Sequence, residues 1–181
     1  MRLRSAIISH PRIVATGLAA AIGITVFVFL YFEPQALFID KKVDEALPTA
    51  SAPAQPATGT AAPAPAPAPK TLASGSFTSF EHDTSGRASV VDLGGGRRIL
   101  RFEDFSTSNG PDVRVYLSGA PASSDGDRFD DRYVELGELK GNIGNQNYRI
   151  PASLNLSDYR SVVVWCKRFS VAFGAAPLVL S

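Results

Sequence analysis

Twenty consecutive residues without a charged side chain, Ile13 to Phe32, constrain the N-terminal part of this chain most strongly. A helix needs about 20 mainly apolar residues to cross the hydrocarbon core of a bilayer, so the span predicts a transmembrane helix. Arg2, Arg4 and Arg12 precede it. Basic residues on the N-terminal flank keep that side in the cytoplasm, which predicts a cytoplasmic segment over residues 1–12 and export of the rest.

A cleaved signal peptide is the alternative to a lasting anchor. The apolar region of a signal peptide usually has about 7–15 residues and ends at a cleavage site made of small residues. The span in this chain is longer, and Glu33, Pro34 and Gln35 follow it. We therefore expect an uncleaved anchor over residues 13–32 that binds the lipid bilayer and places the C-terminal part outside the cytoplasm, in the periplasm or the extracellular space.

An Ala/Pro-rich tract follows, from Ala46 to Lys70, and it includes the run APAPAPAP. Alternating Ala and Pro favours extended polyproline II and offers no side chains that could form a core. At about 3.1 Å per residue, such a tract would reach roughly 75 Å. We expect residues 33–70 to form a disordered linker that holds a folded domain, residues 71–181, away from the membrane.

Short apolar runs separated by Gly, Asn, Asp and Pro make up the expected domain. Val113, Val115 and Leu117 alternate with other residues, which is typical of a strand with one buried face. Turn residues recur about every ten positions, and no stretch of that length keeps apolar residues at helical spacing. Strands are expected over residues 75–80, 88–93, 99–102, 113–117, 132–136, 148–150, 161–166 and 169–173. The pattern predicts an all-β domain of about eight strands, an antiparallel β-sandwich or a barrel.

The stretch SVVVWCKRF, residues 161–169, contains the main candidate for a functional side chain. Val162 to Trp165 is rich in β-branched and aromatic residues, which suits a strand buried on both faces. The only cysteine, Cys166, comes next, and Lys167 and Arg168 follow it. Two neighbouring cations would stabilise a thiolate. Free cysteine is also among the most frequently buried residue types, so a structural role in the core is the alternative.

The charge balance and the cysteine count exclude several classes of function. From Leu72 onward there are 12 basic and 13 acidic residues, and the whole chain has a formal net charge of +1. A nearly neutral domain lacks the basic surface that binding to nucleic acid requires. One cysteine cannot form an intrachain disulfide or a multi-cysteine zinc site.

Three blocks of residues, in order, resemble the DM13 domain family, also called electron-transfer DM13: Leu100–Ser118, Leu136–Pro151 and Ser161–Leu178. A weaker block, Gly75 to Val90, is similar to the start of that domain. The resemblance implies a β-rich domain that serves extracytoplasmic electron transfer. It also implies that Cys166, at the family's hallmark cysteine, acts as a redox thiol or as a ligand of a prosthetic group such as haem. The cytochrome-like and DOMON domains that often accompany the family do not occur in this sequence, so a redox partner would be a separate protein.

Three further residues are candidates for a site around Cys166. His82 is the one histidine of the expected domain, and imidazole and thiolate each ligate haem iron in haem proteins, although a histidine without such a role is the alternative. Asp112 follows the turn signal Asn-Gly-Pro and either completes a turn or organises a site through loop amides. Asn145 lies in an amide-rich stretch, residues 140–148, and either satisfies irregular backbone or forms a polar wall near the thiol.

No metal site is expected. An acidic run, Asp125, Asp127, Asp130 and Asp131, lacks the bidentate glutamate of an EF-hand loop, so we expect a solvated acidic loop. The chain also has no serine hydrolase elbow, phosphate-binding loop or HExxH helix, and whether it is an enzyme stays open. Two functions remain: a membrane-tethered redox module that uses Cys166, with Trp165, Lys167 and Arg168 supporting it, or a stalked binding or scaffolding domain without catalysis.

Overall fold

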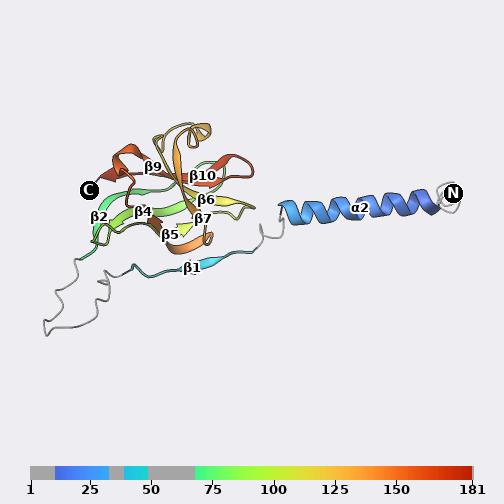
Figure 1. Ribbon diagram of the computed structural model, residues 1–181, viewed down its shortest axis with the longest axis horizontal. Helices are drawn as coiled ribbons and strands as arrows, with labels where there is room; N and C mark the ends of the chain where they lie inside the picture. The colour runs from blue at the N-terminus through green and yellow to red at the C-terminus, as the bar shows by residue number, and fades with distance from the viewer. Residues whose placement is uncertain (1–10, 33–38, 49–67, 181) are drawn as a thin grey trace.

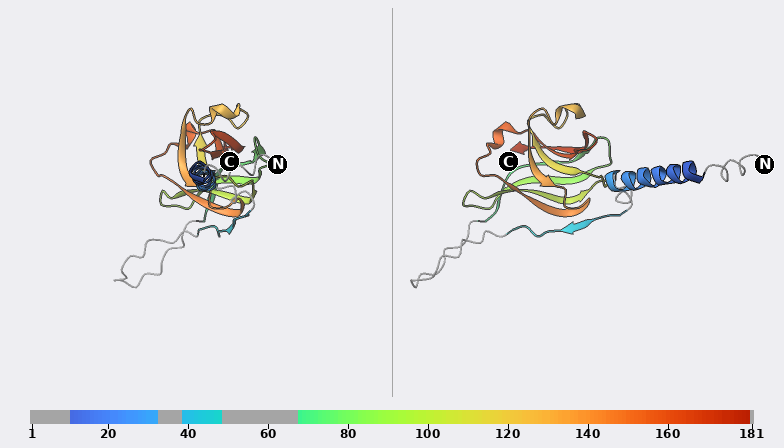
Figure 2. Two further views of the ribbon diagram at one scale, coloured as in Figure 1. Left: turned by 90° about the vertical axis from the view of Figure 1, so that its right-hand side faces the viewer. Right: turned by 45° about the vertical axis from the view of Figure 1, so that its right-hand side comes forward.

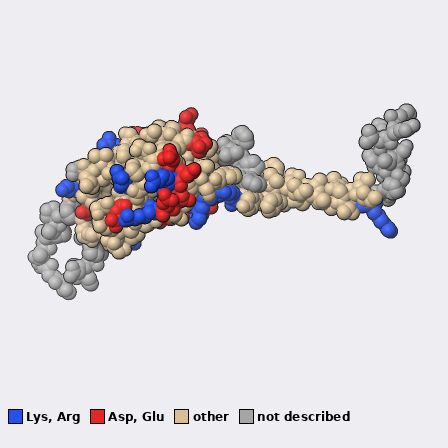
Figure 3. Space-filling model, turned by 90° about the horizontal axis from the view of Figure 1, so that it is seen from above, with Lys and Arg blue, Asp and Glu red and all other residues tan. Residues whose placement is uncertain are grey.

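The computed structural model describes residues 11–32, 39–48 and 68–180, which form one long helix and a two-layered β domain (Figure 1). Helix α2 (Pro11–Phe32) extends away from the domain in Figure 1 and in the right view of Figure 2, and the left view shows it end-on. Its stretch Arg12–Tyr31 has a mean hydropathy of 2.5, and none of it is buried against the protein. Beyond its first turn, the helix surface in Figure 3 carries no Lys, Arg, Asp or Glu. The length and composition are those of a membrane anchor or of a signal sequence.

The β domain is a sandwich of two sheets. The first sheet has the order β1-β8-β5-β4-β2-β11, with β1 (Lys42–Asp44), β2 (Lys70–Ser76), β4 (Ser85–Asp92), β5 (Arg98–Ser106), β8 (Ile143–Ile150) and β11 (Val179–Leu180). The second has the order β3-β10-β9-β6-β7, with β3 (Thr78–Ser79), β6 (Val113–Ser118), β7 (Tyr133–Glu138), β9 (Ser161–Cys166) and β10 (Val171–Pro177). Short 3₁₀ turns span Gly126–Arg128 and Leu156–Asp158. The predicted all-β sandwich is therefore confirmed, and the described sheets do not close into a barrel.

One predicted strand and one predicted loop differ from the structure in an informative way. The stretch 75–80 was expected as one strand, but the chain leaves the first sheet after β2 and enters the second at β3. Phe77 makes this crossing, and its buried ring meets Phe102 and Phe105 edge-on at centroid distances of 5.0 and 5.1 Å. The amide-rich stretch 140–148 was expected as a loop, yet most of it belongs to β8. The sequence pattern did not indicate this strand because Asn145 and Asn147 make it polar. Their side chains bind Asp44 and Ala46 of the segment beside β8 and do not pack in the core.

Strand β9 is buried at all six positions, as its composition predicted. Because side chains alternate along a strand, Val162, Val164 and Cys166 belong to the cluster between the two sheets. Val163 and Trp165 face the other way and join a second cluster on the outer face of the sheet. Phe129, fully buried, covers this second cluster from the loop that follows β6.

The expected linker contains a strand that the sequence did not predict. Residues 42–44 form β1, which pairs in parallel with residues 143–145 of β8, at the edge of the first sheet (Figure 1). It is the one parallel pair among the described strands. The Ala/Pro tract lies mostly within residues 49–67, and the expected cytoplasmic segment mostly within residues 1–10. Both lie outside the described residues, so their predicted states stay predictions.

The outer cluster makes a direct prediction for stability. Trp165 is 3% exposed, and its ring stacks on Tyr116 with 6.2 Å between centroids. Replacing a buried aromatic side chain with alanine removes apolar burial and leaves a cavity. We expect Trp165→Ala to lower the free energy of unfolding by about 3–5 kcal/mol. Urea unfolding followed by circular dichroism measures this loss, since the variant lacks the only tryptophan.

A nearby residue supplies the control. Phe169 is 53% exposed, so Phe169→Ala is expected to change the free energy of unfolding by less than about 1 kcal/mol. A loss for Trp165→Ala as small as that of the control would show that the outer cluster does not stabilise the fold.

Candidate functional site

The thiol of Cys166 lies inside the folded domain. Cys166 is the last residue of β9 and is 0% exposed. It belongs to the apolar cluster between the sheets, and its Cα partners on the flanking strands are Val113 of β6 and Val171 of β10. The sequence predicted that Cys166 ends a strand and that two cations follow it, and the structure confirms that the strand ends at Cys166. The side chain points into the core, however, because position 166 has the same parity as Val162 and Val164.

The two cations after Cys166 have partners elsewhere. Lys167 is exposed, its Nζ lies 3.5 Å from Glu135 Oε2, and its main-chain N–H donates to the main-chain oxygen of Asp112 at 2.9 Å. Arg168 is half-buried, and its guanidinium lies 4.3 Å from the centroid of the Tyr31 ring in α2. In the folded state, therefore, the contacts of both cations are with groups other than the sulfur.

A polar hollow of about 490 Å³ lies next to this strand end. Its walls include Lys41, Asn109, Asp112, Val113, Arg114, Glu138, Gly141, Asn142 and Arg168. Arg114 pairs with Asp112 and lies 3.2 Å from Glu135 and 3.3 Å from Glu138. The hydrogen bond to Asp112 raises the pKa of the Arg114 guanidinium, and the three carboxylates stabilise its charge further. Asp112 lies in the turn before β6, as its turn signal predicted, and its carboxylate pairs with Arg114 and not with the loop amides that the second suggestion named, so a role in organising a site stays a prediction.

The hollow and the thiol are close in the fold but separated by side chains. Val113 lines the hollow and is also the cross-strand partner of Cys166. Cys166 itself lines neither this hollow nor the larger apolar cavity described below. Access from the hollow to the sulfur therefore requires a local movement of the chain.

His82 contacts Phe173 and Thr84 in the structure. Its ring packs on the ring of Phe173, with 3.8 Å between centroids, and Phe173 belongs to the same apolar cluster as the cysteine. Its main-chain oxygen accepts a hydrogen bond from Thr84 Oγ1 at 3.1 Å. Among the described residues, no group of three or more His, Cys, Asp or Glu side chains could hold a metal ion.

The residues do not fit a haem that is ligated by Cys166. An axial ligand must face a cavity large enough for the macrocycle, whereas this sulfur is fully enclosed by aliphatic and aromatic side chains. The cavities beside the domain core are lined by other residues. The haem role that the family resemblance implies for Cys166 and His82 is therefore not supported by this arrangement.

Asn145 lies in the other sheet from Cys166 and binds a different part of the chain. Its Nδ2 donates to Asp44 Oδ1 at 2.7 Å, and its Oδ1 accepts from the main-chain N–H of Asp104 at 3.0 Å. Asn142 and Asn147, from the same stretch, also bind residues near β1. These amides hold the segment before the Ala/Pro tract, a role that the sequence did not suggest.

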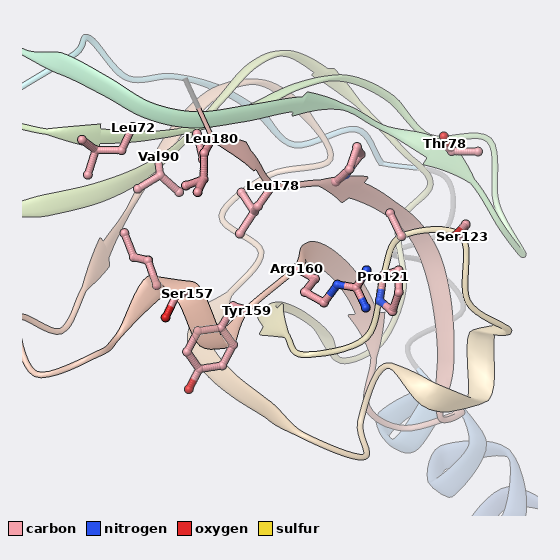
Figure 4. Close-up of a pocket in the computed structure, with 14 residues that line it drawn as sticks. Leu72, Thr78, Val90, Pro121, Ser123, Ser157, Tyr159, Arg160, Leu178 and Leu180 are labelled. Carbon is pink, nitrogen blue, oxygen red and sulfur yellow. The ribbon is translucent and has the colours of Figure 1, made fainter.

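A second hollow is an apolar cavity of about 640 Å³, at the end of the domain that is remote from α2 (Figures 1 and 4). Leu72, Val90, Leu178 and Leu180 form one wall, and the side facing them is formed by a loop and turn that include Pro121, Tyr159 and Arg160 (Figure 4). The Arg160 guanidinium makes no hydrogen bond or ion pair within the described part of the chain. Sequence reasoning missed this cavity because its lining comes from segments that are distant along the chain.

Comparisons with known proteins identify the domain. The family described as electron transfer DM13 matches residues 76–178. This match includes β9, Cys166, the polar hollow except Lys41, and the amide-rich strand β8. Searches of the curated proteins and of the solved structures found no match. Because the matched region is more than half of the chain, this protein belongs to the electron transfer DM13 family.

Proposed function

We propose that the protein is a membrane-anchored redox module whose domain lies outside the cytoplasm, and that the Cys166 thiol reacts when the turn after β9 opens. Membership of the electron transfer DM13 family and the apolar helix α2 support the general role. The observation that supports the specific role, a reaction of the Cys166 thiol, is the position of this residue. It is the last strand residue before a turn, and one side chain, Val113, is shared between its strand pairing and the polar hollow.

The turn over residues 167–170 has the properties of a segment that opens locally. Lys167, Phe169 and Ser170 are exposed. Ser170 has a φ of +53°, a left-handed conformation that costs a non-glycine residue about 1 kcal/mol or more. The Nη1 atom of Arg168 is buried and has no hydrogen-bond partner among the described residues. Solvent exposure, the strained backbone of Ser170 and the unsatisfied Arg168 atom lower the free energy of local opening below that of global unfolding.

Exchange with a disulfide of a partner protein is the reaction that suits a single thiol. The S–H bond of Cys166 breaks and its proton passes to water. The sulfur then forms a bond with one sulfur of the partner's disulfide, and the other partner sulfur leaves as a thiolate. Cys166 is oxidised and the leaving sulfur is reduced. Because the chain has one cysteine, a thiolate of a further molecule must attack the Cys166 sulfur; the partner then leaves with both of its sulfurs reduced, and Cys166 stays in a disulfide with the attacking molecule.

A non-catalytic binding domain is the second candidate, and two observations favour it. The sulfur is fully enclosed in the core, as a structural cysteine would be. The apolar cavity of about 640 Å³ lies elsewhere, and the Arg160 guanidinium at its wall has no hydrogen-bond or ion-pair partner among the described residues. Such a cavity suits a small apolar ligand with a carboxylate or carbonyl group.

The redox proposal predicts that the thiol reacts while the protein stays folded. We expect an aromatic disulfide reagent to modify Cys166 in the full chain at a rate that is independent of urea at low concentrations, because local opening exposes little surface. Stopped-flow absorbance across a urea series measures this rate. A rate that follows the global unfolding constant at every concentration would contradict the proposal.

The neighbouring cations give a second prediction for the opened state. Lys167 and Arg168 would stabilise the thiolate once the turn has moved. The double variant Lys167→Gln, Arg168→Gln is expected to react several-fold more slowly at neutral pH. The control Lys70→Gln, Arg97→Gln removes the same charge at two exposed positions remote in sequence and should react at the original rate. Equal rates for both variants would show that the two cations do not assist the thiol.

Removal of the sulfur separates the two candidate functions. Cys166→Ala deletes one buried atom, so we expect a loss of about 1 kcal/mol in the free energy of unfolding and an intact fold. For the redox module, this variant no longer forms a mixed disulfide with proteins of the same compartment on a non-reducing gel. If no such adduct forms with the original protein either, the binding domain is the better description.

A further inference from the structure

The domain binds the segment 39–46 through its main chain. This segment precedes the Ala/Pro tract and includes β1, and it lies along the free edge of β8 (Figure 1). The main-chain N–H of Glu45 donates to the oxygen of Asn145 at 2.8 Å, and that of Ile143 donates to the oxygen of Lys41 at 3.4 Å. Addition of an extended segment to an open sheet edge is a common mode of peptide recognition.

Asparagine side chains of the domain form hydrogen bonds with main-chain groups of the segment 39–46. Asn142 Oδ1 accepts from the N–H of Lys41 at 2.7 Å, and its Nδ2 donates to Asp40 at 2.9 Å. Asn147 Nδ2 donates to the oxygen of Ala46 at 2.9 Å. Asn109, from the turn before β6, donates to the oxygen of Ile39 at 2.7 Å. With Asn145, these side chains contact the segment along its whole length.

Two glycines leave room for the segment. A Cβ atom on Gly141 would come within 2.3 Å of the oxygen of Lys41 and 2.7 Å of a methyl group of Val43. A Cβ atom on Gly144 would come within 2.0 Å of the oxygen of Val43. The nearest atoms to both positions belong to the bound segment and not to the body of the domain. The glycines therefore make space for a bound strand.

One carboxylate fixes the register. Glu45 accepts hydrogen bonds from Lys140 Nζ at 2.7 and 2.9 Å and from the N–H of Asn147 at 2.7 Å. Arg101 donates to the main-chain oxygen of Glu45 at 3.1 Å. Burial alone raises the pKa of the Glu45 carboxyl, but the hydrogen bonds and the charge of Lys140 outweigh it, so this pKa lies below its ordinary value.

We propose that the edge of β8 is a peptide-binding site of the DM13 domain, and that residues 39–46 are its exchangeable ligand in cis. Asn109, Lys140, Gly141, Asn142, Gly144, Asn145 and Asn147 all lie within the matched family region, whereas the bound segment lies outside it. The partner that fits in trans is an extended peptide with a carboxylate where Glu45 lies. β1 has only three residues, and four of the eight side chains in the segment belong to exposed charged residues, so exchange is compatible with the contacts.

The bound segment changes the arrangement that the sequence suggested. Nine residues, 33 to 41, separate α2 from β1, which limits this gap to about 35 Å. The Ala/Pro tract then joins β1 to β2, two strands of one sheet, instead of separating the domain from α2. Release of the segment would make residues 33–69 the connection, with a reach of roughly 115 Å if extended. This last consequence rests on the proposed membrane anchor; the binding site does not.

Cleavage of the connection tests the site in the full chain. We would replace part of residues 55–62 with a protease site, fold the protein in detergent, cut it, and follow both fragments by size exclusion over a concentration series. The proposal predicts that the N-terminal fragment elutes with the folded domain. Separation of the fragments at all concentrations, with the domain still folded by circular dichroism, would overturn it. Neither outcome depends on Cys166 or on membrane topology, so the proposed function is tested separately.

Gly141→Ala provides a matched variant, because its Cβ would collide with the bound segment. We expect the fragments of this variant to dissociate at about tenfold higher concentration or more. Gly126→Ala is the control: its Cβ would meet only Phe80, at an ordinary 3.8 Å. Equal dissociation in both variants would refute the assigned role of the glycine.

A synthetic peptide tests exchange in trans. The peptide IDKKVDEA, residues 39–46, should displace the N-terminal fragment from the cut protein, and the same peptide with Glu45→Gln should need about tenfold more. Failure of the first peptide to displace the fragment would show that the ligand is not exchangeable, and equal potency of the two would refute the role of the carboxylate.

The cut protein should also respond to acid. A carboxyl group whose pKa is lowered by binding stabilises the bound state above its free pKa, about 4.3, and loses this contribution as the pH falls through the lowered value. The charged and titratable groups around Glu45 are Lys140, Arg101, Glu103 and Tyr148. We expect acid to release the fragment at a pH that is higher than the pH at which the domain unfolds. Retention down to the pH of unfolding would contradict the role of Glu45.

Discussion

The burial of β9 on both faces is the constraint on which the rest of this structure depends. A strand with Val162, Val164 and Cys166 on one face and Val163 and Trp165 on the other needs apolar cover on both sides. The first sheet supplies the inner cover. The loop around Phe129 supplies the outer one, and the hydrogen bond of Ser118 Oγ to the Phe129 oxygen, 2.8 Å, holds that loop in place. The same parity that buries the valines also directs the thiol inward.

This arrangement decides what chemistry a lone cysteine can have here. Sequence adjacency places Lys167 and Arg168 beside the thiol along the chain, but the strand ends at Cys166 and the turn carries the cations to Glu135 and Tyr31. A thiol buried next to a strained turn is shielded in the closed state, and under the proposed function a local opening would expose it. The polar hollow lies beside the same turn, so opening would bring the sulfur to a charged and hydrated surface and not to an apolar one.

The sequence predicted the parts of the fold in which local pattern and burial agree. Alternation at Val113, Val115 and Leu117 gave β6, and the β-branched run gave β9. It failed where a strand serves something other than the core. β1 has too few residues to show any period, and the amides of β8 look like loop residues because their partners lie about a hundred positions away along the chain. For the candidate site, the sequence indicated residues but not which of them lie together in the fold. Asp112 and Arg168 line one hollow, whereas His82 packs on Phe173 and Asn145 binds Asp44.

The peptide site and the hollow near the thiol share a wall. Lys41, Gly141 and Asn142 line the hollow, and Asn142 Oδ1 binds the N–H of Lys41. If the segment 39–46 left β8, the hollow would lose Lys41 from its wall and open further to solvent. Arg168, from the turn after β9, also lines the hollow and contacts Tyr31 near the end of α2, the helix that precedes this segment in the chain. The proposed exchange at the β8 edge and the proposed opening beside Cys166 would therefore act on one cavity and would be energetically coupled through the shared wall. In a chain with a single thiol, this coupling would let a bound peptide control when the sulfur is exposed.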